Sequence, residues 1–374
     1  MVSASEFARY SRHLALPGFG IEGQEKLKAA RVLVVGAGGL GCPLLQYLAA
    51  AGIGTIGIID HDIVSLSNLQ RQVLFSVQDI GKKKAEVARE KLHDLNPIVI
   101  INAYPEKLAS RNALSLFAQY DVIADCSDNF PTRYLVNDAA VLSGKPYVYG
   151  SVFRFEGQVA VFNQVLENSR RSGNYRDLYP QPPLPGEVPN CEDAGVLGAS
   201  TGIIGTLQAL MIIKLLAGIS HAEPNTYHLF DAVRMEMKSM RFKSREDNPL
   251  TGIKPSIQTL QDYELFCGIK SAQGLEVKQI TGRELLQLRE SNTAFQLIDV
   301  REQAEYDQFN IGGSLVPLST LTDHIALIRK DIPVIIYCQS GQRSMQAVAR
   351  LQSEYQFHNL LNLSGGIAGL NAEV

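Results

Sequence analysis

Cysteine is scarce in this sequence, with five residues among 374. An odd, thinly spread set does not form the framework of a disulfide-rich secreted domain, so it favours a reducing compartment. An excess of positive charge is also missing, because 35 Lys and Arg residues face 38 Asp and Glu residues. This balance argues against a nucleic-acid coat protein and against a polybasic membrane-binding protein.

Long apolar segments are rare as well. The N-terminal residues MVSASEFARYSRHL lack the apolar core that a signal peptide requires. The most apolar stretch, residues 202–219, contains Gln208 and Lys214, so we expect a buried helix there rather than a membrane span. These features predict a cytoplasmic protein with no membrane partner and no nucleic-acid partner.

Buried β-branched runs alternate with helical patterns in the first part of the chain. We predict strands at 31–35, 55–60, 98–103, 121–126 and 147–152, separated by helices at 43–51, 82–94 and 131–143. This alternation predicts an α/β fold with a Rossmann-like, doubly wound and mostly parallel sheet. Runs at 158–163 and 226–230 predict an antiparallel extension of that sheet.

Two segments interrupt the pattern. Residues 168–190 contain the sequence YPQPPLPGEVP, which is typical of a lid, a binding segment or a disordered loop. A second break at 245–272 precedes a smaller α/β unit with predicted elements at 281–288, 295–300, 334–337, 344–355 and 360–363. We therefore expect a first domain at 1–245, a linker at 246–275 and a second domain at 276–374.

A glycine-rich loop, GAGGLG, lies directly between a predicted strand and a predicted helix. Glycine lets the backbone approach phosphates closely at the positive end of a helix, so Gly36, Gly38, Gly39 and Gly41 predict a nucleotide site. Asp60 ends the next strand, where an acid can bind ribose hydroxyls. The glycines alone leave a dinucleotide, ATP and a purely structural tight turn open.

Charged residues that follow the predicted strands at 55–60 and 121–126 favour ATP over a dinucleotide as the ligand. Arg71 and Lys84 can neutralise a triphosphate, whereas a hydride-transfer cofactor carries only a pyrophosphate. The alternative for residues 82–84 is a solvated basic face. Asp125 and Asp128 follow another strand at the same edge of the sheet, where carboxylates can hold Mg²⁺ beside phosphates.

Five motifs, RYSRH, GAGGLG, DHDIVSLSNLQRQ, GKKKAE and DCSDNFPTR, make residues 5–243 resemble the MoeB/ThiF family, the bacterial relatives of ubiquitin-activating enzymes. The resemblance implies that ATP and Mg²⁺ are used to adenylate the C-terminal Gly-Gly carboxylate of a ubiquitin-like sulfur carrier protein. It also implies that Arg12 reaches the ATP site of a partner subunit, and hence a homodimer. The other matching residues are Gly38 and Gly41 for the nucleotide loop, Asp60 for the ribose, Asn68, Arg71 and Lys84 for the phosphates, and Asp128 for Mg²⁺-assisted catalysis.

The sequence departs from the family at its usual zinc site. Many members bind zinc through two Cys-x-x-Cys pairs, but the matching positions here are Asn174, Asp177, Thr251 and Lys254. These side chains do not make a tetrahedral thiolate site, so we predict no zinc.

Cys191 follows the Pro-rich segment, at a position where related proteins have a cysteine. In some of them it is thought to form a covalent link to the activated carrier. The neighbouring Glu192 and Asp193 would raise the pKa of its thiol, so a covalent role and a non-essential loop cysteine both stay open.

Cys338 lies in a loop between a predicted strand and a predicted helix, with four residues separating it from Arg343. Backbone N–H groups and a helix N-terminus favour a thiolate in such a loop, and Arg343 can grip an anion. With LIDVRE, IGGS and LSGGI, this loop makes residues 276–374 resemble the rhodanese family, which implies sulfur transfer through a Cys338 persulfide. A phosphatase loop has five residues between Cys and Arg; an inactive structural domain is the other alternative.

Together, the two resemblances predict an adenylyltransferase with sulfurtransferase activity that converts a MoaD-type carrier to its thiocarboxylate for molybdopterin biosynthesis. The sulfur donor would be a cysteine desulfurase or thiosulfate. The segments VPNCEDAGVLG and TGIIGTLQA resemble the MoeB-type branch most. A ThiS-type carrier for thiamine synthesis or a tRNA-thiolation carrier is the alternative within this chemistry. An NAD-dependent oxidoreductase with a binding module, or a non-catalytic scaffold, is the alternative outside it.

Overall fold

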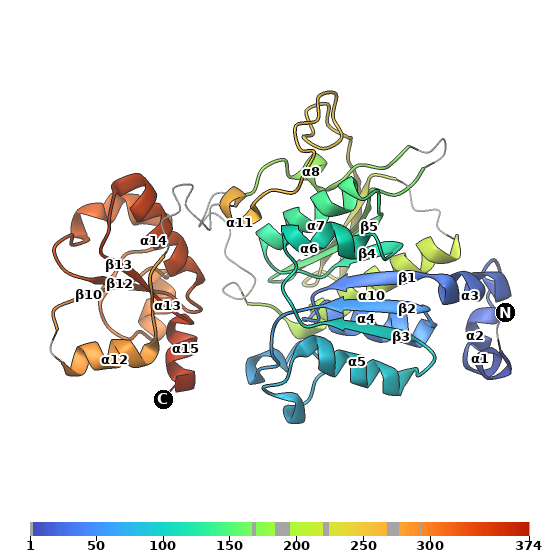
Figure 1. Cartoon of the computed structure of the whole chain (residues 1–374), viewed down its shortest axis with the longest axis horizontal. Helices are drawn as coiled ribbons and strands as arrows, with labels where there is room; N and C mark the ends of the chain where they lie inside the picture. The colour runs from blue at the N-terminus through green and yellow to red at the C-terminus, as the bar shows by residue number, and fades with distance from the viewer. Residues whose placement is uncertain are drawn as a thin grey trace. The chain divides into compact units, whose positions relative to one another are not determined.

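The computed structural model describes residues 3–166, 170–183, 195–219, 224–267, 277–291 and 293–373. Nearly all described residues up to Gln261 form a first compact unit, and those from Asp262 onward form a second (Figure 1). The segment expected as a linker, 246–275, is thus divided between the two units where it is described.

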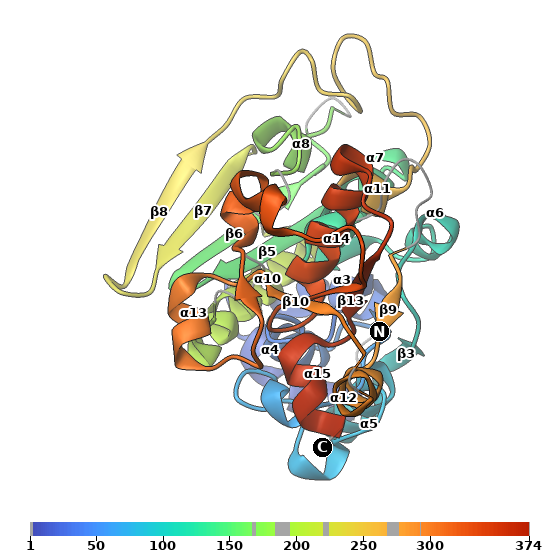
Figure 2. The same ribbon diagram turned by 90° about the vertical axis from the view of Figure 1, so that its left-hand side faces the viewer.

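An eight-stranded sheet forms the centre of the first unit, in the order β3-β2-β1-β4-β5-β6-β7-β8. The first five strands are parallel neighbours: β1 (Arg31–Val35), β2 (Thr55–Ile59), β3 (Ile100–Tyr104), β4 (Val122–Asp125) and β5 (Tyr147–Phe153). The antiparallel extension consists of β6 (Glu156–Phe162), β7 (Thr226–Asp231) and β8 (Glu236–Arg241), and Figure 2 shows β7 and β8 as a long ribbon at its edge. The predicted fold class is confirmed.

Helices cover both faces of this sheet. On one face, α4 (Gly41–Ala51), α5 (Lys84–Leu95) and α10 (Gly198–Ala217) pack together, with α10 also against β5 and β6. On the other face, α6 (Ser110–Phe117) and α7 (Phe130–Leu142) pack together, with α7 against β4 and α8 (Tyr175–Leu178) (Figure 1). Because both faces are covered, β1 is buried along almost its whole length, as parallel strands usually are.

Helix α10 is long and apolar enough to cross a membrane by length and composition alone. It packs, however, against α4, β5 and β6, and Ile204, Gln208 and Ile212 on it are fully buried. One face of α10 therefore belongs to the core of the first unit, in agreement with the helix predicted there.

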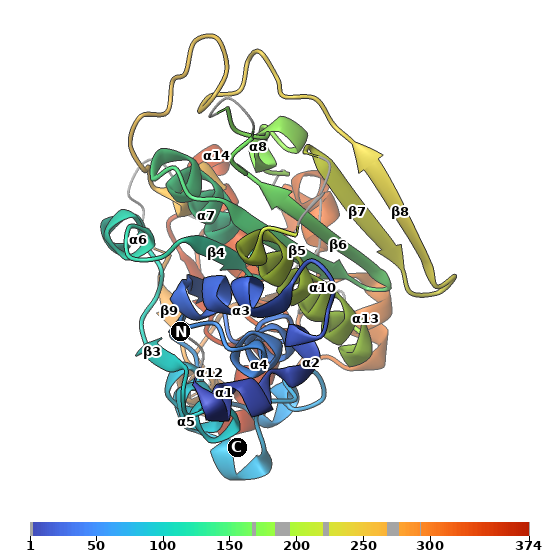
Figure 3. The ribbon, with the colours of Figure 1, turned by 90° about the vertical axis from the view of Figure 1, so that its right-hand side faces the viewer.

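Three N-terminal helices precede the sheet and were not expected from the sequence: α1 (Ala4–Arg9), α2 (Ser11–Leu14) and α3 (Gly20–Ala29). Figure 3 shows them together on the side of the unit where α10 lies, and α3 contacts α10. Ser3 and Glu6 form a capping box that begins α1. A buried hydrogen bond from Asn96 Nδ2 to Tyr10 Oη, 2.9 Å long, ties this region to the end of α5.

The second unit contains a five-stranded parallel sheet in the order β11-β10-β12-β13-β9. Its strands are β9 (Gln279–Ile280), β10 (Gln296–Asp299), β11 (Ser314–Leu315), β12 (Val334–Tyr337) and β13 (Leu360–Leu363), and its helices are α11 (Tyr263–Phe266), α12 (Gly282–Glu290), α13 (Gln303–Gln308), α14 (Gln342–Tyr355) and α15 (Gly366–Glu373). Alternate residues of β12 enter two apolar clusters on opposite faces, so the central strand is buried on both sides, and Cys338 follows its last residue.

Candidate functional site

The predicted nucleotide-site residues of the first unit follow the carboxyl ends of three strands. Gly36 follows β1, Asp60 follows β2, and Asp128 lies just beyond β4. The strand order reverses between β1 and β4, because the chain continues from β1 to β2 on one side and reaches β4 on the other. Ligands of open α/β sheets bind at such a switch point.

The glycine loop needs its glycines for two different reasons. Gly36 has φ of 94°, a left-handed conformation, and its N–H donates to the Ile59 carbonyl at 3.0 Å. A Cβ on Gly41 would lie 2.0 Å from the carbonyl oxygen of Gly36, so the start of α4 packs directly on the loop backbone. At Gly38 the nearest atom to such a Cβ is Gln72 Nε2, 3.8 Å away, which leaves that part of the loop more open.

Asp60 holds the glycine loop and the segment after β2. Its Oδ2 accepts a hydrogen bond from the Ala37 N–H at 2.7 Å, and its Oδ1 accepts one from the Asp62 N–H at 2.8 Å. Burial raises the pKa of this carboxyl group, while the charge of Lys84 and the two backbone hydrogen bonds oppose the rise. The role of Asp60 toward a ribose stays a prediction.

The predicted phosphate-contacting residues lie after β2 and at the start of α5. The Lys84 side chain is nearly buried, and its Nζ lies 3.0 Å from Asp62 Oδ2. Asn68 ends a short 3₁₀ turn and accepts a hydrogen bond from the Ser65 N–H at 3.3 Å. Arg71 is half-buried and donates to the Ser67 carbonyl at 3.1 Å.

Asp128 lies on a tightly fixed turn between β4 and α7. The buried Asp125 carboxylate accepts hydrogen bonds from Ser127 N–H at 3.0 Å and from Ser127 Oγ at 2.6 Å. On the other side, Asn129 caps α7 by accepting from the Thr132 N–H at 3.0 Å. Asp128 itself is exposed, and its Oδ1 accepts from Asn129 Nδ2 at 3.3 Å.

Asp128 fits as a magnesium ligand better than the acidic group after β2. Asp60, His61 and Asp62 offer ligand atoms within 4.8 Å of one another. However, Asp60 already accepts two backbone hydrogen bonds, and Asp62 pairs with Lys84. An exposed carboxylate at the end of a parallel strand is a suitable oxygen ligand for Mg²⁺ beside phosphates.

Three of the positions that match the family's zinc ligands, Asn174, Asp177 and Thr251, take part in hydrogen bonds. Asn174 Nδ2 donates to Thr251 Oγ1 at 3.1 Å, and buried Asn248 donates from Nδ2 to Asp177 Oδ1 at 2.7 Å. The Arg245 N–H donates to the same Asp177 oxygen at 2.8 Å. Side-chain hydrogen bonds therefore join the segment around α8 to residues 245–251.

In the second unit, Cys338 is fully buried at the end of β12. Its Sγ accepts hydrogen bonds from the Gly341 N–H at 3.1 Å and from Ser344 Oγ at 3.4 Å. Gly341 is the N-cap of α14 and Ser344 lies in its first turn, so both donors come from the N-terminal end of that helix.

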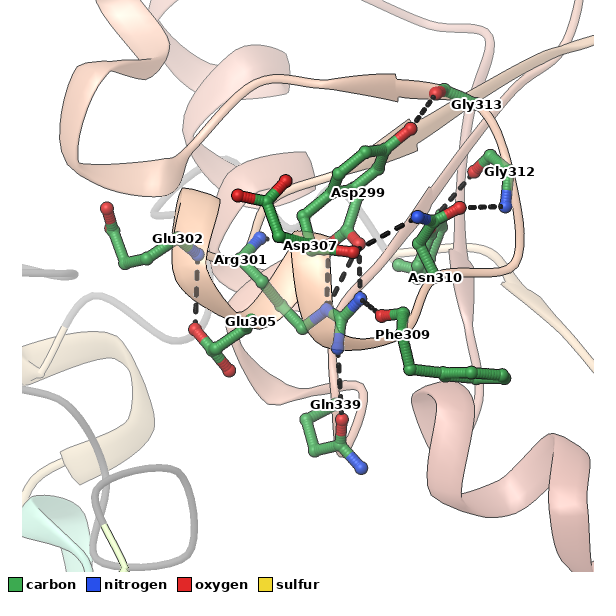
Figure 4. A network of polar contacts seen from close by, with 12 residues as sticks. Asp299, Arg301, Glu302, Glu305, Asp307, Phe309, Asn310, Gly312, Gly313 and Gln339 are labelled. Atoms are coloured by element: carbon green, nitrogen blue, oxygen red, sulfur yellow. Dashed lines mark hydrogen bonds and ion pairs between the residues drawn. The ribbon is translucent and has the colours of Figure 1, made fainter.

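Two arginines support the loop that begins at Cys338, and each is paired with a carboxylate. Arg301 pairs with buried Asp299 and also donates to Gln339 Oε1 at 3.3 Å and to the Phe309 carbonyl at 2.6 Å (Figure 4). Arg343 donates to Glu305. The predicted anion-binding guanidinium therefore already has a carboxylate partner in the structure.

For the remaining predicted site residues, the structure gives the position but no contact that tests the predicted role, or does not describe the residue. Arg12 is exposed on α2, and Cys191 lies outside the described residues. Gly39 lies beside Thr201 of α10, since a Cβ there would come within 3.0 Å of Thr201 Oγ1. Sequence reasoning gave no site role to Gln208 or Glu305. For Gln208, the signal available in the sequence was a polar amide within an apolar stretch that was expected to form a buried helix.

Fold and site together define a doubly wound α/β unit with a glycine loop at its switch point and, later in the chain, an α/β unit with a cysteine loop. Residues 10–251 match the ThiF family, and residues 281–373 match the rhodanese-like domain. The chain belongs to the ThiF family and carries a C-terminal rhodanese-like domain.

Two of three named relatives match nearly the whole chain, and the third matches 71% of it. The probable adenylyltransferase/sulfurtransferase MoeZ of Mycobacterium tuberculosis is 45% identical over 372 residues, 98% of this chain and 93% of that protein. The adenylyltransferase and sulfurtransferase MOCS3 of Mus musculus is 43% identical, covering 94% and 81%. A sulfur carrier protein adenylyltransferase of Thermus thermophilus is 48% identical over 71% of this chain and 98% of its own length. The predicted enzyme class is confirmed.

Solved structures agree with the fold. The crystal structure of E. coli MccB with ATP superposes with a TM-score of 0.56 at 23% identity, covering 67% of this chain and 75% of that one. A likeness at this identity supports the fold alone.

Proposed function

We propose that this chain uses ATP to adenylate the C-terminal Gly-Gly carboxylate of a ubiquitin-like sulfur carrier and then delivers sulfur to it from Cys338. Residues 1–245 would form the adenylyltransferase domain, 246–275 the linker and 276–374 the sulfurtransferase domain. The observation that carries the proposal is the meeting of the glycine loop, the Asp62–Lys84 pair and the Asp128 turn at one switch point of the sheet.

The first step activates a poor electrophile. A carboxylate oxygen of the carrier attacks the α-phosphorus of ATP, the bond to the β-phosphate oxygen breaks, and pyrophosphate leaves. Lys84, Arg71 and the N–H groups of the glycine loop would neutralise and orient the phosphates, which is the main contribution a protein can make to this chemistry. Asp128 would hold Mg²⁺, which supplies charge neutralisation on the phosphate oxygens when bound.

The second step places sulfur on the activated carbon. The outer sulfur of a Cys338 persulfide attacks the acyl adenylate and AMP leaves, which gives an acyl disulfide. A thiol that attacks the sulfur of Cys338 then releases the thiocarboxylate and leaves a disulfide, which a cellular reductant reopens. A cysteine desulfurase or thiosulfate would reload Cys338, and Cys191 is the candidate for a covalent link to the carrier.

The carrier we propose is of the MoaD type, for molybdopterin biosynthesis, with a ThiS-type or tRNA-thiolation carrier as the alternative. We also propose a homodimer in which Arg12 completes the partner's ATP site. The apolar side chains of Phe7 on α1, Ile21 on α3 and Leu210 on α10 are exposed. They support a contact of these helices with another protein chain.

The direct experiment mixes the chain with purified carriers ending in Gly-Gly and measures pyrophosphate release for each. The matching carrier should consume ATP and, with a sulfur donor, gain the mass of one sulfur in place of one oxygen. Protection from heat by Mg–ATP but not by NADH should accompany it. Stabilisation by NADH alone would favour an oxidoreductase and contradict the proposal.

A further inference from the structure

Helix α10 touches three of the backbone segments that carry or adjoin predicted site residues: the one with Arg71, the glycine loop and the end of β4 before Asp128. A Cβ on Gly198 would lie 2.3 Å from the Gln70 carbonyl oxygen and 3.2 Å from the Arg71 Cα. Three residues further along, Thr201 lies against Gly39 of the glycine loop. A Cβ on Gly205, one turn later, would lie 2.3 Å from the carbonyl oxygen of Leu40.

Gln208 continues this face of the helix and reaches the third segment. Its Nε2 donates to the carbonyl of Asp125 at 2.8 Å and to that of Val148 at 3.2 Å. Its Oε1 lies 3.6 Å from the Sγ of Cys126, within hydrogen-bond range for a thiol. Thr201, Gly205 and Gln208 are spaced for one face of a helix, so a single rigid element sets the glycine loop relative to the Asp128 turn.

Burial makes this arrangement specific. Gln208 is fully buried in a largely apolar helix, where an amide without partners would be costly. A Cβ on Gly150 of β5 would come 2.3 Å from Gln208 Cδ, so the strand leaves room for this side chain through a glycine. An apolar residue at 208 would fill the same volume but leave the Asp125 carbonyl without this donor.

We propose that Gln208 is a positioning residue for the adenylation site. It fixes the turn that carries Asp128 relative to the glycine loop. This role rests on the proposed function. Gln208 acts through the Asp125 carbonyl and the turn stabilised by Ser127, and Gly205 acts on the glycine loop through Leu40. The two residues should therefore affect different kinetic parameters.

The test measures carrier-dependent ATP–pyrophosphate exchange in the full chain. Gln208→Met should lower kcat about tenfold or more and change the KM for ATP far less, because a small displacement of a catalytic group is costly. Gly205→Ala should mainly raise the KM for ATP. Ile212→Val, another fully buried position of α10, is the matched control and should keep both parameters close to wild type.

Folding is monitored by thermal unfolding for every variant. A folded Gln208→Met variant with wild-type kcat would overturn the positioning role. If that variant does not fold, Gly150→Ala, which pushes on the same amide, is judged by the same criterion. Absence of exchange in the wild-type chain would overturn the proposed function itself, and this role with it.

Discussion

Arg343 donates hydrogen bonds from both terminal nitrogens of its guanidinium to the carboxylate of Glu305, at 2.8 and 2.7 Å. The pair joins α14, which begins next to the Cys338 loop, to α13. Hydrogen bonding by Arg343 lowers the pKa of Glu305 below its ordinary value. A guanidinium bound in this two-pronged way holds the loop as well as offering charge to a substrate.

The first prediction concerns acid stability of this pair. Because its pKa is lowered in the folded state, Glu305 stabilises the fold fully above its ordinary pKa of 4.5, and this contribution is lost as the pH falls below that value. Glu305→Gln should therefore lower the free energy of unfolding at pH 7, by roughly 1 kcal/mol or less for a partly exposed pair. The stability of this variant should also depend less on pH below 5 than that of the wild type.

The control is Glu354→Gln, which removes the exposed pair between Arg350 and Glu354 on α14. It should change the unfolding midpoint very little at any pH. An equal loss in both variants at pH 7 would contradict the structural role of Glu305.

A second prediction follows from the hydrogen bonds to Cys338 Sγ. Incubation with a sulfane-sulfur donor should add one sulfur atom to the chain, and intact-mass spectra should show it. Cys338→Ala should stay unchanged under the same conditions. Ser344→Ala removes one donor to the sulfur and should slow loading without preventing it. Identical spectra of wild type and Cys338→Ala would refute the persulfide.

A third prediction concerns Asp128. Asp128→Ala should abolish carrier-dependent exchange. Because Asp128 is exposed on a turn that other residues fix, the free energy of unfolding should change by less than about 1 kcal/mol. Exchange and thermal unfolding of the same preparation check both halves. Wild-type exchange in this variant would refute the catalytic role.

A fourth prediction tests shared sites in the proposed homodimer. Arg12→Ala and Asp128→Ala should each be inactive alone. A mixture of the two should regain part of the exchange activity, because one site of a mixed dimer combines an intact Asp128 with an intact Arg12. Mixing each variant with itself is the control, and no recovery after verified subunit exchange would argue against a donated Arg12.

A fifth prediction concerns the hydrogen bonds at the positions of the family's zinc ligands. Asn248→Ala removes a buried donor to Asp177 and should destabilise the first unit by about 1–3 kcal/mol. Strong chelators should leave the unfolding midpoint of the wild type unchanged. Metal analysis that finds about one tightly held zinc per chain would overturn the expectation.

Local chemistry made much of the first unit predictable. Strand β1 was predicted with its observed bounds, because a β-branched run that ends at glycines has few alternatives in an α/β chain. Strand β8 was missed, since EMKSMR is exposed at every position and carries no alternation of apolar residues. It forms through backbone pairing with β7, which the side-chain pattern does not encode.

The same difference separates the site residues. Glycines and charged residues that follow predicted strands can be recognised from residue type and position alone, so the sequence was sufficient to predict Gly36, Asp60 and Asp128 as site residues. The partners of Gln208 and Arg343 could not, because each contact joins segments distant in the chain. The Gln208 contact with Asp125 spans 83 positions and the Arg343 contact with Glu305 spans 38.

The depth of Cys338 has a further consequence for handling sulfur. A resting thiol that is fully covered is shielded from oxidants and alkylating reagents in bulk water. The proposed persulfide would extend the side chain by one S–S bond of about 2 Å, so its outer sulfur would lie farther from the backbone than Sγ does. The enzyme would thus be guarded when empty and reactive when charged.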